Sequence, residues 1–324
     1  MKRILAILLC LLMTAGAAAC GSASGAGDKA ATLSVVTTIF PEYDWIRELT
    51  AGVDGVELTL LLDNGVDLHS YKPTADDIVK IADCDLFVYV GGESDEWVED
   101  VLATANNEKM IAVSLLEALG DNVKAEEVKE GMEAEEEEEE GGEGEEEYDE
   151  HVWLSLKNAE FLTGLLAGKL GELDAPHASV YSANAAAYAD KLRALDERYA
   201  AAVAGARVKT LLFGDRFPFR YLVDDYGLDY YAAFVGCSAE SEASFETVVF
   251  LANKVDELGL GAIMQIESAD GSIARTIKDN TKTKDQTILT LDSLQSTTSR
   301  DIDDGKTYLS AMEDNLSVFA EALK

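Results

Sequence analysis

Short β-type runs alternate with helical segments along most of the chain, and this order is the feature that most restricts the fold. In the first half, runs rich in Val, Leu and Ile occupy 33–39, 56–62, 85–91 and 109–115. The segments between them carry helix signals, such as the Thr before "ADDIVKIAD" and the Ser before "DEWVEDVLATAN". Such hydroxyl side chains accept hydrogen bonds from the free N–H groups of a first helical turn. This alternation predicts an α/β domain with a mostly parallel sheet.

A second set of strand-like runs follows in the last third of the chain. It occupies 208–214, 229–234, 262–267 and 287–292, with helical segments "FETVVFLANKVDELG" and "GSIARTIKDN" between them. A chain of 324 residues is long enough for two hydrophobic cores. We therefore expect two α/β lobes.

A long amphipathic stretch separates the two sets. From about Pro176 to Ala204, apolar side chains recur at steps of three and four residues: Tyr181, Ala185, Tyr188, Leu192, Leu195, Tyr199 and Val203. A helix of this length runs roughly 40 Å, enough to span two lobes. The sequence thus predicts two lobes, each a mostly parallel β-sheet flanked by helices, joined by one long backbone helix. The expected bounds are 32–175, 176–205 and 206–324.

The N-terminus has the pattern of an export signal. "MKR" precedes the apolar run "ILAILLCLLM" and the small residues "TAGAAAC". A signal over 1–19 that ends before Cys20 is typical of a bacterial lipoprotein, in which that cysteine receives the lipid. The alternative is an ordinary secretory peptide cut near Ala19. Residues 20–31 are small and polar and predict a flexible tether. Either way we expect an extracytoplasmic protein, at the cell surface or the periplasmic face.

Charge and cysteine content exclude two classes of protein. The chain has 26 basic and 62 acidic residues, a net charge of −36, which excludes nucleic-acid binding through phosphates. Much of the excess lies in the Glu-rich segment 125–150, which predicts a disordered, solvated loop. Weak collection of cations is a second interpretation of this loop. Cys84 and Cys237 predict two free thiols, so the chain is not a disulfide scaffold.

Polar side chains follow several of the predicted strands. Ligands of open α/β sheets bind beyond the carboxyl ends of strands, so we consider the polar residues at these places: Asp67, His69, Asp215, Arg216, Glu267 and Asp292. His151, which follows the acidic segment, joins them. Two imidazoles with one or two carboxylates suit zinc, with manganese or iron possible. Each carboxylate alone is more often a helix cap or a solvated charge. His177 is interpreted as a surface residue at the start of the long helix.

Several motifs resemble those of a known family, the substrate-binding lipoproteins of zinc and manganese ABC importers. They are "VVTTIFPEYDWIREL", "DLHSYKPTADDI", "ADCDLFVYVGG", "DEHVWLS", "FRYLVDDYGL" and "LTLDSLQ", and the resemblance as a whole runs from about Leu33 to Leu323. The resemblance implies that His69, His151 and Asp292 are metal ligands. It also implies that the insertion before His151, which is often His-rich in zinc binders, collects metal; here it is Glu-rich.

The chain departs from the family pattern at the third ligand. That ligand is a His or Glu shortly before the aromatic–x–Tyr motif, and the matching residue here is Arg216, which cannot bind a cation. Asp215 is adjacent and could substitute for it. Glu267 or a water molecule is the alternative.

The expected function is the capture of a divalent cation between the two lobes and its delivery to an ABC permease, without catalysis. Zinc is the first expected ion and manganese the second, because a given set of nitrogen and oxygen ligands binds zinc more tightly. We expect a monomer held at the membrane by an N-terminal lipid. One alternative is an exported zinc hydrolase with Glu267 or Asp215 as general base, although the chain has no HExxH or serine-elbow motif. Another is a surface adhesion lipoprotein that acts through its acidic loop.

Overall fold

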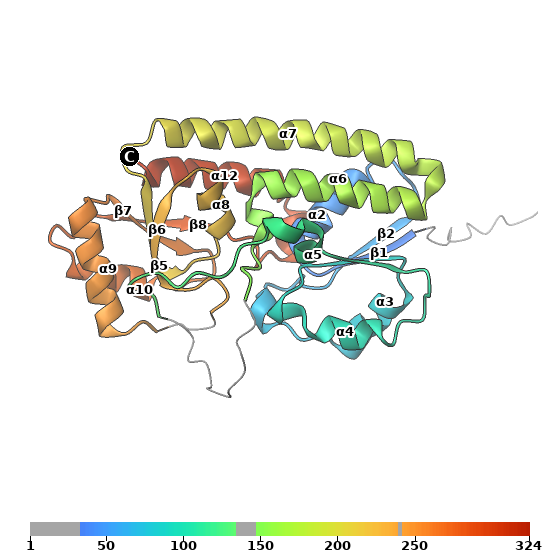
Figure 1. Ribbon diagram of the computed structural model, residues 1–324, viewed down its shortest axis with the longest axis horizontal. Coiled ribbons are helices and arrows are strands. Elements are labelled where there is room, and N and C mark those ends of the chain that lie inside the picture. Colours follow the sequence, from blue (N-terminus) through green and yellow to red (C-terminus); the bar gives the residue numbers. More distant parts are fainter. Residues whose placement is uncertain (1–32, 134–146, 239–241) are drawn as a thin grey trace, which may run out of the picture.

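The computed structural model describes residues 33–133, 147–238 and 242–324 (Figure 1). The predicted signal, Cys20 and the tether lie outside these ranges. The N-terminal sheet contains β1 (Leu33–Thr37), β2 (Val56–Leu60), β3 (Leu86–Tyr89) and β4 (Ile111–Ser114). Its strands are all parallel, in the order β2-β1-β3-β4. The helices of this lobe are α2 (Phe40–Leu49), α3 (Ala75–Asp83), α4 (Trp97–Leu102), α5 (Leu115–Leu119) and α6 (Leu156–Leu173).

The C-terminal sheet repeats this arrangement. Its strands are β5 (Thr210–Arg216), β6 (Asp229–Phe234), β7 (Ala262–Ile266) and β8 (Thr287–Leu291), parallel and in the order β6-β5-β7-β8. Its helices are α8 (Arg220–Asp225), α9 (Phe245–Leu258), α10 (Ser272–Asn280), α11 (Ser299–Asp303) and α12 (Tyr308–Ala322). The predicted fold class, two parallel α/β sheets with flanking helices, is confirmed.

Alternating residues of β5 supply two different cores. Leu211 and Phe213 belong to a large cluster of buried side chains that runs through both lobes, whereas Leu212 belongs to a smaller cluster under α9 and α10. This division follows from the period of two along a strand. Because the large cluster includes residues of both sheets, the lobes share a core.

The long helix α7 (Ala178–Ala204) lies across both lobes, above α6 and α12 (Figure 1). Every residue of the predicted apolar stripe is buried. The helix packs against α2 and α6 of the first lobe and against α12 of the second. Among the described residues, no helix is both long enough and apolar enough to cross a membrane.

The pattern of "HVWLSLKNAEFLTGLLAGKLGEL" predicts a helix from His151, but α6 begins only at Leu156. Ser155 caps α6 through a hydrogen bond from the Asn158 N–H (3.1 Å), and a separate 3-10 turn, Val152–Leu154, precedes it. This break leaves His151 in a loop. The Glu-rich segment is also partly ordered, since Glu126 N–H donates to Glu147 O (2.9 Å) and Glu133 N–H donates to Ala233 O (2.9 Å). Its centre, 134–146, lies outside the described residues.

Candidate metal centre

His69 lies in a single 3-10 turn, Leu68–Ser70, shortly after β2. Asp67 caps this turn by accepting a hydrogen bond from the His69 N–H (3.1 Å), and the fully buried Leu68 anchors it in the core. The chain then runs extended to Thr74, which caps α3 in a capping box. These local interactions fix the backbone on both sides of His69.

His151 is fully buried, and Asp149 sets its orientation. One oxygen, Asp149 Oδ1, accepts from the His151 N–H (2.9 Å) and lies 3.1 Å from His151 Nδ1. The Trp153 ring packs against the imidazole, with centroids 5.2 Å apart. Since a carboxylate next to Nδ1 favours the tautomer with the proton there, Nε2 carries the lone pair. This is the arrangement of a metal-binding imidazole.

The two imidazoles meet edge to edge. His69 Nε2 and His151 Nε2 are 3.2 Å apart, although the residues are separated by 82 positions in the chain. On its other side, His69 Nδ1 is 2.7 Å from Ser94 Oγ. Burial and the neighbouring His151 hold the pKa of His69 well below its usual range. His69 is therefore suited to bind a cation in the neutral form, beside the Nε2 of His151.

Cys237 completes this group. Among the described residues, ligand atoms of His69, His151 and Cys237 all lie within 4.8 Å of one another. Both Cys84 and Cys237 are free thiols, as predicted. Sequence reasoning did not select Cys237 as a ligand, but its place just beyond the carboxyl end of β6 satisfies the same strand-end rule that selected His69.

Glu150 lies beside the histidines with one oxygen unpaired. Its Oε1 accepts from the Ser94 N–H (2.9 Å), whereas Oε2 is buried, has no hydrogen-bond partner and lies 3.5 Å from His69 Nδ1. Burial raises the pKa of Glu150 to about 7. The side chain is only 2% exposed. It places a carboxyl group next to the position where a cation would bind.

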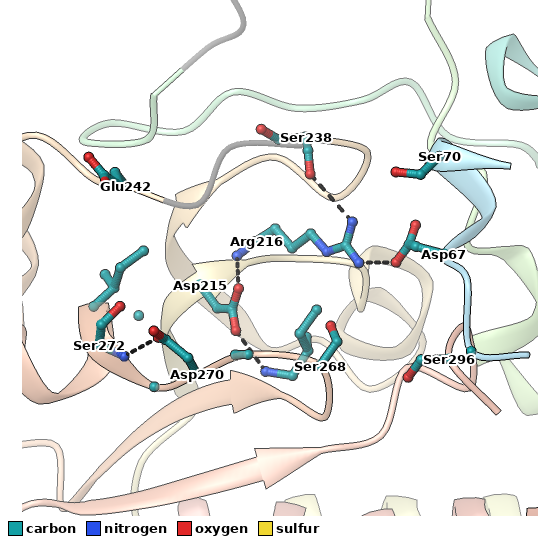
Figure 2. Close-up of a pocket in the computed structure, with 16 residues that line it drawn as sticks. Asp67, Ser70, Asp215, Arg216, Ser238, Glu242, Ser268, Asp270, Ser272 and Ser296 are labelled. Atoms are coloured by element: carbon teal, nitrogen blue, oxygen red, sulfur yellow. Dashed lines mark hydrogen bonds and ion pairs between the residues drawn. The ribbon is translucent and has the colours of Figure 1, made fainter. Parts of the chain in front are cut away.

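The predicted carboxylate ligands lie outside the group. Asp215 accepts from the N–H groups of Arg216 (2.9 Å) and Ile266 (3.0 Å), and Figure 2 shows it directed toward this backbone. Glu267 accepts from the Ser293 N–H (2.7 Å) and from two serine hydroxyls, those of Ser293 and Ser296. Both carboxylates fix the backbone at strand ends.

Asp292 is also engaged elsewhere. Its Oδ1 accepts from the Leu294 N–H (2.8 Å), and Oδ2 is 2.6 Å from Lys306 Nζ. His177 is partly exposed and paired with Asp174, consistent with the surface position expected from the sequence. The structure thus brings His69 and His151 together and holds Asp215, Glu267 and Asp292 in other interactions.

Arg216 forms an ion pair between the lobes. Its guanidinium pairs with Asp67 and donates to Ser238 O (3.4 Å), as Figure 2 shows. Burial opposes ionisation of Asp67, but the nearby Arg216 charge lowers the pKa of that carboxyl below its usual range. A cleft of about 560 Å³ lies around this pair. The residue at the expected third-ligand position therefore neutralises a carboxylate of the other lobe.

A second cleft, of about 490 Å³, reaches His69 and is rich in carboxylates. Both His69 and Cys237 line it, together with Tyr71, Trp97, Glu93, Glu96, Glu126, Glu147 and Glu150. Glu126 and Glu147 come from the two ordered ends of the Glu-rich segment. The local charge favours the approach of a cation.

Comparison with known proteins gives consistent matches over nearly the whole chain. A family model described as "ZnuA: Zinc-uptake complex component A periplasmic" matches residues 35–322. The chain is 32% identical over 323 residues to the zinc-binding lipoprotein AdcA of Streptococcus pneumoniae serotype 4, covering 99% of this chain and 61% of that protein. It is 30% identical over 322 residues to the high-affinity zinc uptake system protein ZnuA of Bacillus subtilis, covering 98% and 96%.

A solved structure has the same fold. The Zn(II)-bound ZnuA-like domain of Streptococcus pneumoniae AdcA aligns with a TM-score of 0.70 and 29% identity, over 90% of this chain and 98% of that one. The present chain spans about 61% of the length of the AdcA proteins from Streptococcus pneumoniae.

Proposed function

This chain belongs to the family of zinc-uptake complex component A, and on that premise we propose that it is the extracytoplasmic solute-binding component of a metal importer. The observation that carries the proposal is the 3.2 Å approach of His69 Nε2 to His151 Nε2. At this distance one Nε2 can donate a hydrogen bond to the other, and a cation bound by both nitrogens would take the place of that shared proton. The cation is the cargo of the protein.

Zinc is the proposed cargo, with manganese second. Imidazole nitrogen is a preferred zinc ligand, and zinc exceeds manganese in affinity for most sites of this kind. The names of the relatives support the same ion. Relatives whose names include zinc uptake also support an ABC permease as the partner that receives it.

The location and the anchor are part of the proposal. The family description and the lipoprotein relatives support an extracytoplasmic location. We infer that Cys20 carries a lipid that holds the protein at the membrane and that the protein acts as a monomer. The shared core and the helix α7 would limit the relative movement of the lobes, so capture would require rearrangement mainly of the loops at the site.

The sequence-based expectation that Asp292 and Asp215 complete the ligand set stays a prediction. It requires Asp292 to leave Lys306 and Asp215 to leave the Ile266 N–H. If either carboxylate is a ligand, its substitution by Ala should weaken zinc binding as strongly as substitution of a histidine.

Zinc titration of the purified protein and its variants tests the proposal. Loss of a partner that only orients a ligand typically costs about 10- to 100-fold in affinity, so His69→Ala and His151→Ala should each cost at least as much. The double variant should lose tight binding altogether. One equivalent of zinc still bound tightly by the double variant would refute the site. Turnover of ester or peptide substrates by the zinc-loaded protein would favour a hydrolase instead.

A further inference from the structure

We propose that the thiolate of Cys237 is a third ligand of the cation held by His69 and His151. This inference rests on the proposed function, since it concerns the same ion. In the family pattern the third ligand stands at the position of Arg216. Here Cys237, 21 positions later, takes that role. The resulting two-histidine, one-cysteine site favours zinc over manganese.

The distances fit a tetrahedral ion. Zinc binds nitrogen at about 2.0–2.1 Å and thiolate sulfur at about 2.3 Å, so ligand atoms lie about 3.3–3.7 Å from one another. The two Nε2 atoms are 3.2 Å apart, and the group that includes Cys237 lies within 4.8 Å. Ligand atoms of the three residues thus need a rearrangement of roughly 1 Å to reach the spacing of zinc ligands.

The loop that carries Cys237 is built against His151. A Cβ atom on Gly236 would lie 3.0 Å from His151 Cε1 and 2.9 Å from Phe217 O. The absence of a side chain at this position therefore lets the loop reach the imidazole. The Cys237 N–H donates to Glu126 Oε1 (3.4 Å), which holds the loop from the side of the acidic segment.

Arg216 supports the same loop from the other side. Its guanidinium donates to the carbonyl oxygen of Ser238, the residue after Cys237 (Figure 2). Arg216 is therefore a positioning residue: it cannot bind a cation, but it holds the segment that supplies the replacement ligand.

The surroundings favour a cation at this point. Glu150 presents a buried, unpaired Oε2 beside His69, and Asp149 and Glu126 lie near Cys237. Burial is the main cause that raises the pKa of the Cys237 thiol well above its usual value, and these carboxylates raise it further. A bound dication deprotonates a coordinating thiol outright, so the thiol proton would be released to solvent through the carboxylate-lined cleft as the Zn–S bond forms.

The ligand set has a consequence for ion choice. Thiolate is a soft ligand that zinc accepts readily, whereas manganese prefers carboxylate, carbonyl and water oxygens. We therefore expect Cys237→Ser to weaken zinc binding by about 10-fold or more and to leave manganese binding nearly unchanged. The ratio of zinc affinity to manganese affinity would fall by the same factor in this variant.

Cobalt(II) titration of the full-length chain tests the proposal, because thiolate-bound cobalt has a charge-transfer band in the near ultraviolet. The matched control is Cys84→Ser, because Cys84 is buried beside Met110 and lies outside the group. Cys10 and Cys20 are common to all variants. The wild type and Cys84→Ser should show the band, and Cys237→Ser should bind cobalt without it.

X-ray absorption of the zinc-loaded wild type gives a second measurement that does not depend on a variant. It should detect one sulfur atom at about 2.3 Å from zinc. A band that persists in Cys237→Ser, or a zinc spectrum with only nitrogen and oxygen neighbours, would overturn the role of Cys237. Failure of the wild type to bind zinc or cobalt at all would instead refute the proposed function.

Discussion

At the scale of single residues, the orientation of His151 depends on Asp149. We predict that Asp149→Ala lowers zinc affinity by about 10- to 100-fold, because Nδ1 loses the acceptor that leaves Nε2 free for the ion. Asp174→Ala is the matched control, since Asp174 holds His177 Nδ1 in a similar contact (2.7 Å) outside the metal-binding group. Isothermal titration with zinc should show a change for the first variant alone. Equal effects of the two would remove Asp149 from this role.

A buried acid provides a test of pH dependence. Burial raises the pKa of Asp95 to about 6, above the usual range of an aspartate, so its ionised form destabilises the folded state at neutral pH. Protonation of the folded state below about pH 6 relieves this cost, and the gain is complete below about pH 4. Between pH 7.5 and pH 5 the group should add about 1 to 1.5 kcal/mol to the free energy of unfolding.

The variant Asp95→Asn should lose this contribution. The amide oxygen can still accept from the Gly91 N–H, which now donates to Asp95 Oδ2 (2.9 Å). Urea unfolding at the two pH values measures the difference between wild type and variant, so the titration of all other groups cancels. Parallel pH dependences for the two proteins would show that the Asp95 carboxyl is not perturbed by burial.

At the scale of elements, the turn after β3 makes room for Glu150. Gly92 has a φ of +81°, and a Cβ there would lie 2.4 Å from Glu150 Oε1. We predict that Gly92→Ala both destabilises the protein and weakens zinc binding, because the carboxyl group beside His69 must move.

Gly52→Ala separates backbone strain from displacement of the carboxyl group. Gly52 has a φ of +82° and nothing within 4 Å of an added Cβ. The variant Gly52→Ala should lose about 1–2 kcal/mol in its free energy of unfolding, and its zinc affinity should not change. If Gly92→Ala also binds zinc like the wild type, the position of Glu150 does not matter for the site.

The order of the elements could be predicted because apolar β-type runs alternate with segments that carry helix caps. The strand-end rule led to His69, and the residues after the acidic segment led to His151; their side chains meet in the structure. The same rule could not separate them from Asp215 and Glu267, because a carboxylate at a strand end can equally accept backbone N–H groups, as both do. Cys237 was not selected because one cysteine in a loop has no spacing that distinguishes a ligand from a free thiol.

At the scale of the whole molecule, α7 and the shared core join the lobes. We predict that Leu192→Ala, at a fully buried position of α7, lowers the free energy of unfolding by about 2–5 kcal/mol. Unfolding should remain one cooperative transition, since the helix packs on both lobes. The exposed neighbour Asp190 is the control, and its change to Ala should cost about 0.5 kcal/mol or less. Two separate transitions in tryptophan fluorescence and circular dichroism would contradict a shared core.

The central claim is that a zinc ion binds between His69 and His151, where residues 82 positions apart direct their Nε2 atoms at one point. A crystal structure of the zinc-loaded protein, with anomalous data at the zinc edge, tests it most directly. We predict one strong anomalous peak within bonding distance of both Nε2 atoms. A peak held only by carboxylates, away from these two imidazoles, would contradict the claim.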